Sequence, residues 1–237
     1  MRPPGRKDLE RELAAEADPS RADSLAWFFK TGKGEYAEGD RFLGLTVPKM
    51  RRIALRYRAL PFTALSQLLE STFHEHRLAA LEILVAQFER GDDAQRGQIF
   101  DFYLQHTARI NNWDLVDASA PYIVGERLLT RPRDVLYSLV LSQNLWERRI
   151  AIVSTFAFIK RGQTDDTYRL SEQLLGDKHD LIHKATGWAL REAGKVSPPV
   201  LLRFLKKHYE RVPRTTLRYA IERFPANQRK QILRREF

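Results

Sequence analysis

The feature that most constrains the fold of this chain is a helical pattern that returns at a nearly constant interval. Segments of similar character, a charged residue followed by apolar or small ones, start at Arg77, Asp114, Arg149, Lys184 and Arg218. Their starts are 37, 35, 35 and 34 residues apart. Such a recurrence is typical of a chain built from similar structural units that stack on one another.

The length of the period indicates units of two helices each. Paired-helix solenoids of the HEAT and tetratricopeptide kinds repeat at about this length, and the tetratricopeptide signature is missing from this sequence. No alternating β-branched segment with hairpin turns is present either. We therefore predict an all-α protein, a curved α-solenoid of HEAT-like repeats whose concave face is lined by the second helix of each pair. We expect one domain over residues 1–237, with residues 1–6 as a flexible N-terminal tail.

Helix boundaries are marked by capping residues, glycines and prolines. Residues 7–17 and 20–30 read as two helices, the second capped by Asp18, and the glycine-rich residues 31–40 read as a loop. From Val47 the helical pattern continues almost to the end. Proline fits the first turn of a helix and little else in it, so prolines predict further boundaries. These prolines are Pro61, Pro121, Pro132, Pro198, Pro213 and Pro225.

The positive charge of the chain is unevenly distributed. The formal net charge is +10, and the part from Leu145 onward holds 20 of the 40 Lys and Arg but only 10 of the 30 Asp and Glu. The remaining residues are therefore balanced. One-sided positive charge is typical of a nucleic-acid binder, so we predict a nucleic-acid partner for this chain. An ordinary basic surface without a nucleic-acid partner is the alternative.

Other classes of site find little support in the residues. The chain has no cysteine, which excludes disulfides and thiolate metal sites, and no stretch approaches the roughly 20 apolar residues of a membrane span. His179 and His183 have a metal-compatible spacing, but no third ligand is evident. The side chains of residues 74–76 point in different directions around a helix and cannot converge on one ion. We expect a cytoplasmic protein with no metal, no cofactor and no membrane partner.

One aspartate breaks the pattern of the repeat. Its fourth column holds Ala80, Ile152, Gly187 and Ile221, but Asp117 takes this place in the unit that starts at residue 114. Burying an unpaired carboxylate costs several kcal/mol, about 3 or more. Asp117 is therefore either a structural acid paired with a basic neighbour or an acid exposed in a groove for chemistry. The residues alone leave both interpretations open.

Tryptophans and basic residues accompany this aspartate. Trp113 belongs to the unit with the odd acid, and Trp188 follows Gly187, whose small size predicts room beside that indole; Trp146 fits a core position. Basic side chains at the same level predict a stripe that follows a phosphate backbone. These are Arg148, Arg149, Lys184, Arg191, Arg214 and Arg218. The alternative is that part of them serve in ordinary ion pairs on helix faces.

Three segments together carry a resemblance to a known family. Residues 113–117, 145–152 and 184–192 resemble, in the same order, the HEAT-like-repeat alkylpurine DNA glycosylases of the AlkD type. The likeness runs over residues 26–225. It implies a C-shaped solenoid whose basic concave face holds duplex DNA with alkylated bases, and a monomeric enzyme that excises cationic 3- and 7-alkylpurines without metal or cofactor.

The resemblance also implies roles for single residues. Asp117 is expected to be catalytic, Trp113 and Trp188 to flank it, and Arg149 and Arg191 to contact the DNA backbone near the lesion. The chemistry fits these residue types, because a cationic purine leaves without a general acid and a carboxylate stabilises the oxocarbenium-like sugar. No lysine nucleophile is needed, so base excision without strand cleavage is expected.

Two departures lie near the N-terminus. Phe28 stands near the position where better-known members carry a tyrosine, and residues 31–40 form a longer loop than theirs. Some branches of the superfamily bind branched or unusual DNA without excising bases. A non-catalytic HEAT-repeat protein that binds branched or damaged DNA is therefore the alternative function. A protein-binding scaffold is a third, and the charge asymmetry argues against it.

Overall fold

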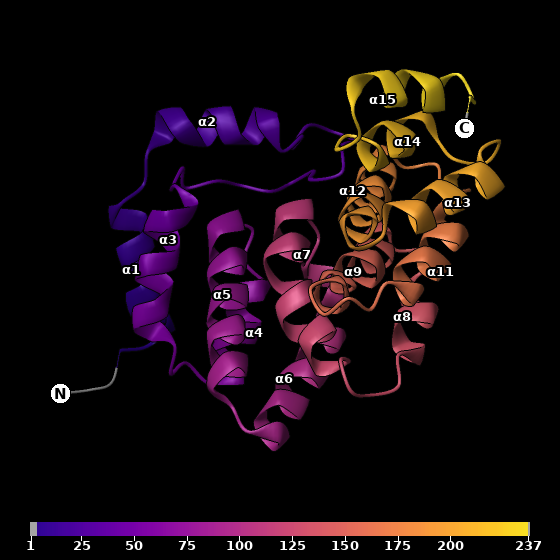
Figure 1. Cartoon of the computed structure of the whole chain (residues 1–237). Helices are drawn as coiled ribbons and strands as arrows, with labels where there is room; N and C mark the ends of the chain where they lie inside the picture. Colours follow the sequence, from indigo (N-terminus) through magenta and orange to yellow (C-terminus); the bar gives the residue numbers. More distant parts are fainter. Residues whose placement is uncertain (1–3, 237) are drawn as a thin grey trace. The chain divides into compact units, whose positions relative to one another are not determined.

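The computed structural model describes residues 4–236, and over this range the chain is built from helices joined by short connections (Figure 1). The one β-type pairing recorded in this range is an isolated bridge between Arg41 and Phe73. The prediction of an all-α protein is confirmed. Within the same range no helix is long and apolar enough to cross a membrane.

The chain divides into two compact units, with the boundary between Ile123 and Val124. The α-helices of the first unit are α1 (Arg6–Ala15), α2 (Pro19–Phe28), α3 (Val47–Ala54), α4 (Phe62–Leu69), α5 (His74–Arg90), α6 (Asp93–Gln105) and α7 (Trp113–Ala120). A π-helical turn at Pro121–Gly125 follows. The α-helices of the second unit are α8 (Asp134–Leu139), α9 (Leu145–Ser154), α10 (Phe156–Ile159), α11 (Asp165–Leu174), α12 (Asp180–Val196), α13 (Pro198–His208), α14 (Arg214–Ala220) and α15 (Ala226–Leu233).

The helices are packed as a repeat of pairs. The five recurring segments lie on α5, α7, α9, α12 and α14. For three of them the preceding helix packs against the repeat helix: α4 on α5 in the first unit, and α8 on α9 and α11 on α12 in the second. Successive second helices also pack on each other: α5 on α7, α9 on α12, and α12 on α14. This arrangement is consistent with the predicted α-solenoid.

Most predicted helix boundaries are confirmed. Pro61, Pro213 and Pro225 are the N-cap residues of α4, α14 and α15, and Pro198 is the first residue of α13. The side chain of Asp18 caps α2 by accepting a hydrogen bond from the backbone N–H of Arg21 at 3.1 Å. The predicted tail is wrong at its end, because α1 already begins at Arg6; residues 1–3 lie outside the described range.

Side chains in the first turn of α5 form hydrogen bonds with the segment that leads into α3. The carboxylate of Glu75 is buried and accepts hydrogen bonds from the backbone N–H groups of residues 43, 44 and 45, at 2.9, 2.8 and 3.3 Å. Arg77, also buried, donates to Asp40 and to the carbonyl of Ser71. Because buried charges persist only when they are paired, these contacts make the N-terminal segments an integral part of the first unit.

Each unit has its own apolar core. In the second unit one cluster joins α12, α13, α14 and α15 around Leu190, Leu205 and Leu217. The side of Gly187 that lacks a Cβ faces α14, where an added Cβ would lie 2.5 Å from the Cβ of Tyr219 and 2.7 Å from the carbonyl oxygen of Thr216. Glycine is therefore required here for the close approach of α12 and α14. The sequence predicts free space beside Trp188 at this glycine. In the structure α14 occupies that space.

Candidate functional site

The helix that carries the odd aspartate starts with a well-defined cap. Asn112 is buried, and its side-chain oxygen accepts a hydrogen bond of 2.8 Å from the N–H of Trp113. Residues four apart lie on the same side of a helix, so Trp113 and Asp117 share one side of α7. Both side chains are partly exposed, whereas Leu115 and Val116 are buried in the core. The helix thus presents an indole and a carboxylate together.

Trp113 is held in place by aromatic neighbours from the N-terminal part of the chain. Phe29 stacks on it with ring centroids 5.3 Å apart and an angle of 14° between the planes. Phe28 meets the indole edge-on at 6.1 Å. Phe29 in turn contacts Phe42 and the imidazole of His74, at 5.1 and 5.0 Å. Contacts of this geometry fix the ring beyond what apolar burial alone provides.

Asp114, the other acid of this unit, forms an ion pair with a buried histidine. The Nε2 of His74 lies 2.7 Å from an Asp114 carboxylate oxygen, and its Nδ1 lies 3.6 Å from Asp40. Burial lowers the pKa of His74, but the two carboxylates outweigh burial and raise it to about 9. His74 is therefore a cation at neutral pH. Asp114 serves as its counter-ion and is a structural acid.

Asp117 lies one turn further along, next to a buried tyrosine. Tyr103 is fully buried and its hydroxyl lies 2.9 Å from that of Ser119. Burial, chiefly, and the charge of Asp117 raise the pKa of Tyr103, against the hydrogen bond with Ser119. Both acids are partly exposed; Asp114 is paired with His74, and Asp117 is on the same side of α7 as Trp113.

The second unit contributes the other predicted tryptophan. Trp188 lies on α12, is partly exposed, and packs against Phe156 with ring centroids 4.3 Å apart. Its joint action with Asp117 stays a prediction. Trp146 is 7% exposed, and its predicted place in the core is confirmed.

Two of the predicted DNA-binding arginines are used inside the second unit. Arg148 lies 2.6 Å from a carboxylate oxygen of Asp177 and also donates to the carbonyl of Ser142. Arg149 is 5% exposed and donates to the carbonyl of Leu181 at 2.8 Å. These contacts join the start of α9 to the connection between α11 and α12. Both guanidinium groups therefore make contacts within the second unit, and their contact with DNA stays a prediction.

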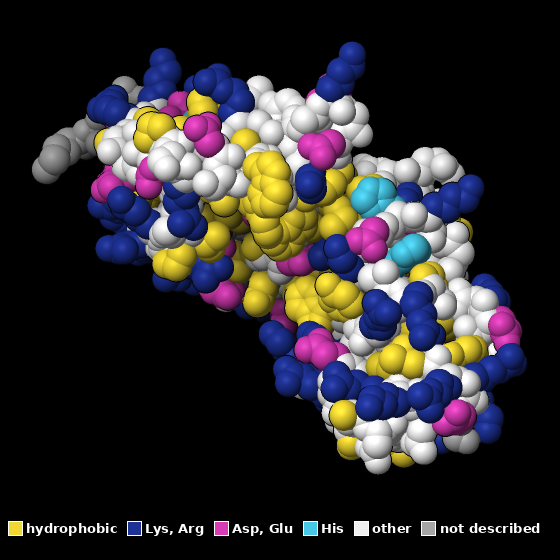
Figure 2. Space-filling view, turned by 90° about the horizontal axis from the view of Figure 1, so that it is seen from above, with side chains coloured by type: hydrophobic (Ala, Val, Ile, Leu, Met, Phe, Trp, Pro, Cys, Tyr) yellow, Lys and Arg dark blue, Asp and Glu magenta, His cyan; other side chains and the backbone are white. Residues whose placement is uncertain are grey.

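The other four predicted cations differ in exposure. Arg191 has 17% of its side chain exposed and pairs with Glu192 and Glu222. Lys184 is 44% exposed beside Asp180. Arg214 and Arg218 are exposed on α14. Figure 2 shows Lys and Arg side chains spread over the face of the second unit that is seen from above.

The histidines weighed as metal ligands make internal hydrogen bonds. His179 accepts the backbone N–H of Leu181 at 3.2 Å, which caps α12, and the Nε2 of His183 lies 2.6 Å from the carbonyl oxygen of Asp177. Among residues 4–236 no group of three or more His, Cys, Asp or Glu is arranged to hold a metal ion.

The sequence reasoning missed the first turn of α5. In the structure His74 orders Asp114 and the rings around Trp113, and Glu75 holds the preceding segment. The available signal was the run of four polar residues at 74–77 directly before the mostly apolar residues 78–86.

The fold is thus that of a helical-repeat protein, and its candidate site combines a partly exposed carboxylate with an indole. Comparison with known proteins gives the family. The model of the DNA alkylation repair enzymes matches residues 9–224, and the chain belongs to that family. It is a DNA repair protein.

A solved structure supports the fold. The chain resembles a protein described as a predicted DNA alkylation repair enzyme from Enterococcus faecalis, with a TM-score of 0.70 over 89% of this chain and 97% of that one. The two sequences are 18% identical, so this likeness concerns the fold alone. None of the curated proteins matches the chain.

Proposed function

We propose that this protein is a monofunctional DNA glycosylase that hydrolyses the N-glycosidic bond of cationic N3- or N7-alkylated purines in duplex DNA. The observation that carries the proposal is the partly exposed carboxylate of Asp117 one helical turn after Trp113, in a member of the DNA alkylation repair enzymes. Asp114 of the same helix is the counter-ion of His74.

The proposed reaction needs only a carboxylate and aromatic faces. An alkylated purine already carries a positive charge, so the electron pair of the breaking C1′–N bond neutralises it and no acid has to protonate it. Asp117 stabilises the positive charge that develops on the sugar and positions the water whose oxygen bonds to C1′. Trp113 offers its face to the same cation. None of these roles calls for a metal ion or a cofactor.

We further propose that Trp188 supplies a second aromatic face and that exposed cations of the second unit contact DNA phosphates. Lys184, Arg214 and Arg218 are the most exposed of the predicted set. For Arg148, Arg149 and Arg191 the internal contacts favour a supporting role, in which they hold the helices that carry the exposed cations.

Base release from methylated genomic DNA tests the proposal. The wild-type protein is expected to release 7-methylguanine, and Asp117→Asn to lose at least about a hundredfold of this activity, as expected for removal of an electrostatic catalyst. Affinity for duplex DNA should stay within about twofold, because one neutral amide replaces one carboxylate. Asp101→Asn, which changes an exposed acid of α6, is the matched control and should retain full activity.

The non-catalytic alternative gives different results in the same experiment. A protein that binds branched or damaged DNA without chemistry would release no methylated purine and would bind a four-way junction more tightly than a linear duplex. Release at the wild-type rate by Asp117→Asn would also refute the proposed role of this residue.

A further inference from the structure

The helix α2 exposes the large apolar side chains that a helix normally buries. Trp27 is 75% exposed and Phe28 is 54% exposed. None of the ten residues of α2 is buried. A short helix gains most of its stability from packing an apolar face, yet the edge-on contacts of Phe28 with Phe29 and Trp113 leave it more than half exposed.

The helix is nevertheless fixed at both ends. At its start, the N–H of Asp18 donates to the carbonyl of Leu43 at 2.8 Å. The neighbouring Gly44 has φ +89°, and a Cβ there would lie 2.1 Å from the carbonyl oxygen of Asp18. At its end, Phe29 is buried against Trp113. In Figure 1, α2 runs crosswise above the ends of α3 and α5.

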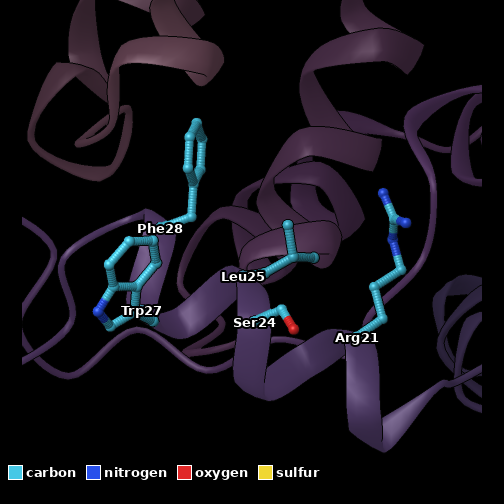
Figure 3. A pocket seen from close by; sticks show the side chains of 5 residues that line it. All are labelled: Arg21, Ser24, Leu25, Trp27 and Phe28. Atoms are coloured by element: carbon cyan, nitrogen blue, oxygen red, sulfur yellow. The ribbon is translucent and has the colours of Figure 1, made fainter.

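Cationic side chains accompany the two rings. Arg21, Ser24, Leu25, Trp27 and Phe28 line an open pocket, and Arg21, Leu25 and Phe28 point to the same side of the helix (Figure 3). The ammonium group of Lys30 lies 5.2 Å from the centre of the Trp27 ring. Exposed apolar side chains lie among Lys and Arg on the face seen in Figure 2. A partner that fits here is flat, apolar and attached to negative charge.

We propose that Trp27 and Phe28 form a stacking surface for a nucleobase of DNA that has left the duplex stack, with Arg21 and Lys30 on the adjacent phosphates. Bases outside a duplex are held in this way, by aromatic faces beside a cationic path for the backbone. The inference rests on DNA as the substrate of the proposed function. Release of a purine leaves the opposite base without a partner, and that orphaned base is the natural occupant.

A duplex with one unpaired base tests the stacking surface directly. The probe is a duplex carrying 2-aminopurine opposite a tetrahydrofuran abasic analogue, compared with the same duplex fully paired. The wild-type protein is expected to bind the unpaired probe about tenfold more tightly and to quench its fluorescence, because stacking on an aromatic side chain contributes roughly this factor. Trp27→Ala combined with Phe28→Ala should reduce the preference to less than about twofold and abolish the quenching.

Two further variants separate stacking from folding. Trp27→Phe keeps an aromatic face and should retain most of the preference. Leu141→Ala removes a side chain that is 71% exposed in the second unit and should change nothing. Circular dichroism and thermal unfolding should be the same for all variants, because none of the altered side chains is buried.

Several outcomes would overturn the proposal. One is a wild-type protein that binds both probes equally, and another is a double variant that keeps the preference and the quenching. A third is a loss of self-association in the double variant at unchanged DNA binding, which would assign the surface to a second copy of the chain. The probe contains no alkylated base, so these results are independent of whether the protein releases 7-methylguanine.

Discussion

At the scale of single residues, α7 illustrates how position along a helix decides what a carboxylate does. Asp114 and Asp117 are three residues apart, yet Asp114 meets the imidazole of His74 at 2.7 Å and Asp117 is on the side of Trp113. A buried ion pair is costly to break, because each charge depends on the other. His74 therefore gives a test of the structural acid that is separate from the test of the proposed catalytic one.

We predict that the stability of the fold depends on pH through His74. Its pKa is raised to about 9 in the folded protein, above the unfolded value of about 6.5, so the protonated form stabilises the fold fully below pH 6.5. This contribution is lost as the pH rises through about 9. His74→Gln should lower the free energy of unfolding by about 3 kcal/mol at pH 6.5 and flatten its decline between pH 7 and 9.5.

Urea unfolding at pH 6.5, 8 and 9.5 measures both effects. His183→Gln is a suitable control, because that imidazole is only partly buried and faces a backbone carbonyl. A decline with pH of equal steepness in wild type and His74→Gln would show that His74 does not carry the charge.

At the scale of helices, the close packing of α12 on α14 depends on Gly187. We predict that Gly187→Ala destabilises the second unit by about 2 kcal/mol, because the new methyl group would meet the backbone of Thr216 and the Cβ of Tyr219. The matched control is Gly176→Ala, where an added Cβ meets no atom within 4 Å. Thermal unfolding compares the two; equal midpoints would mean that α14 shifts at little cost.

Helix positions are largely predictable from the sequence, whereas the contacts that hold the residues around the site are not. The spacing of the repeat and the prolines are local signals, and they indicated α5, α7, α9, α12 and α14 correctly. The contacts of Glu75 with residues 43–45 join parts of the chain about thirty residues apart. Such contacts depend on how the backbone returns, which periodicity does not encode.

The same limit explains why the contacts of the arginines are not predictable from the sequence. Arg148 reads as a surface cation in the sequence, and its partner Asp177 is 29 residues away. The set of cations predicted from the sequence therefore includes residues that make contacts within the second unit. Asp117 and Trp113, in contrast, are four residues apart on one helix, a local spacing that by itself puts both on one side of it.

At the scale of the whole molecule, positive charge predicts the way DNA affinity responds to salt. Replacing Lys184, Arg214 and Arg218 together by alanine should weaken binding to duplex DNA at low salt. The slope of log affinity against log salt should fall by about 0.9 for each phosphate contact removed, and hence by between 2 and 3 in total. Binding isotherms from 50 to 200 mM salt give the slope.

A triple variant of exposed cations elsewhere serves as the comparison. Arg11, Arg58 and Lys160 are exposed, and none of them belongs to α12 or α14. Their replacement changes the net charge by the same amount, so an equal fall in slope would show that net charge alone, and not the proposed set of residues, governs the affinity.

The most direct test of the proposed activity is the single-turnover rate of base release from a duplex with one 7-methylguanine, measured with saturating protein. Under these conditions the rate reports the chemical step and not the affinity. The proposed mechanism predicts measurable release by the wild-type protein and a rate at least about a hundredfold lower for Asp117→Asn. Release by Asp117→Asn at the wild-type rate, or none by a wild-type protein that binds the duplex, would contradict it.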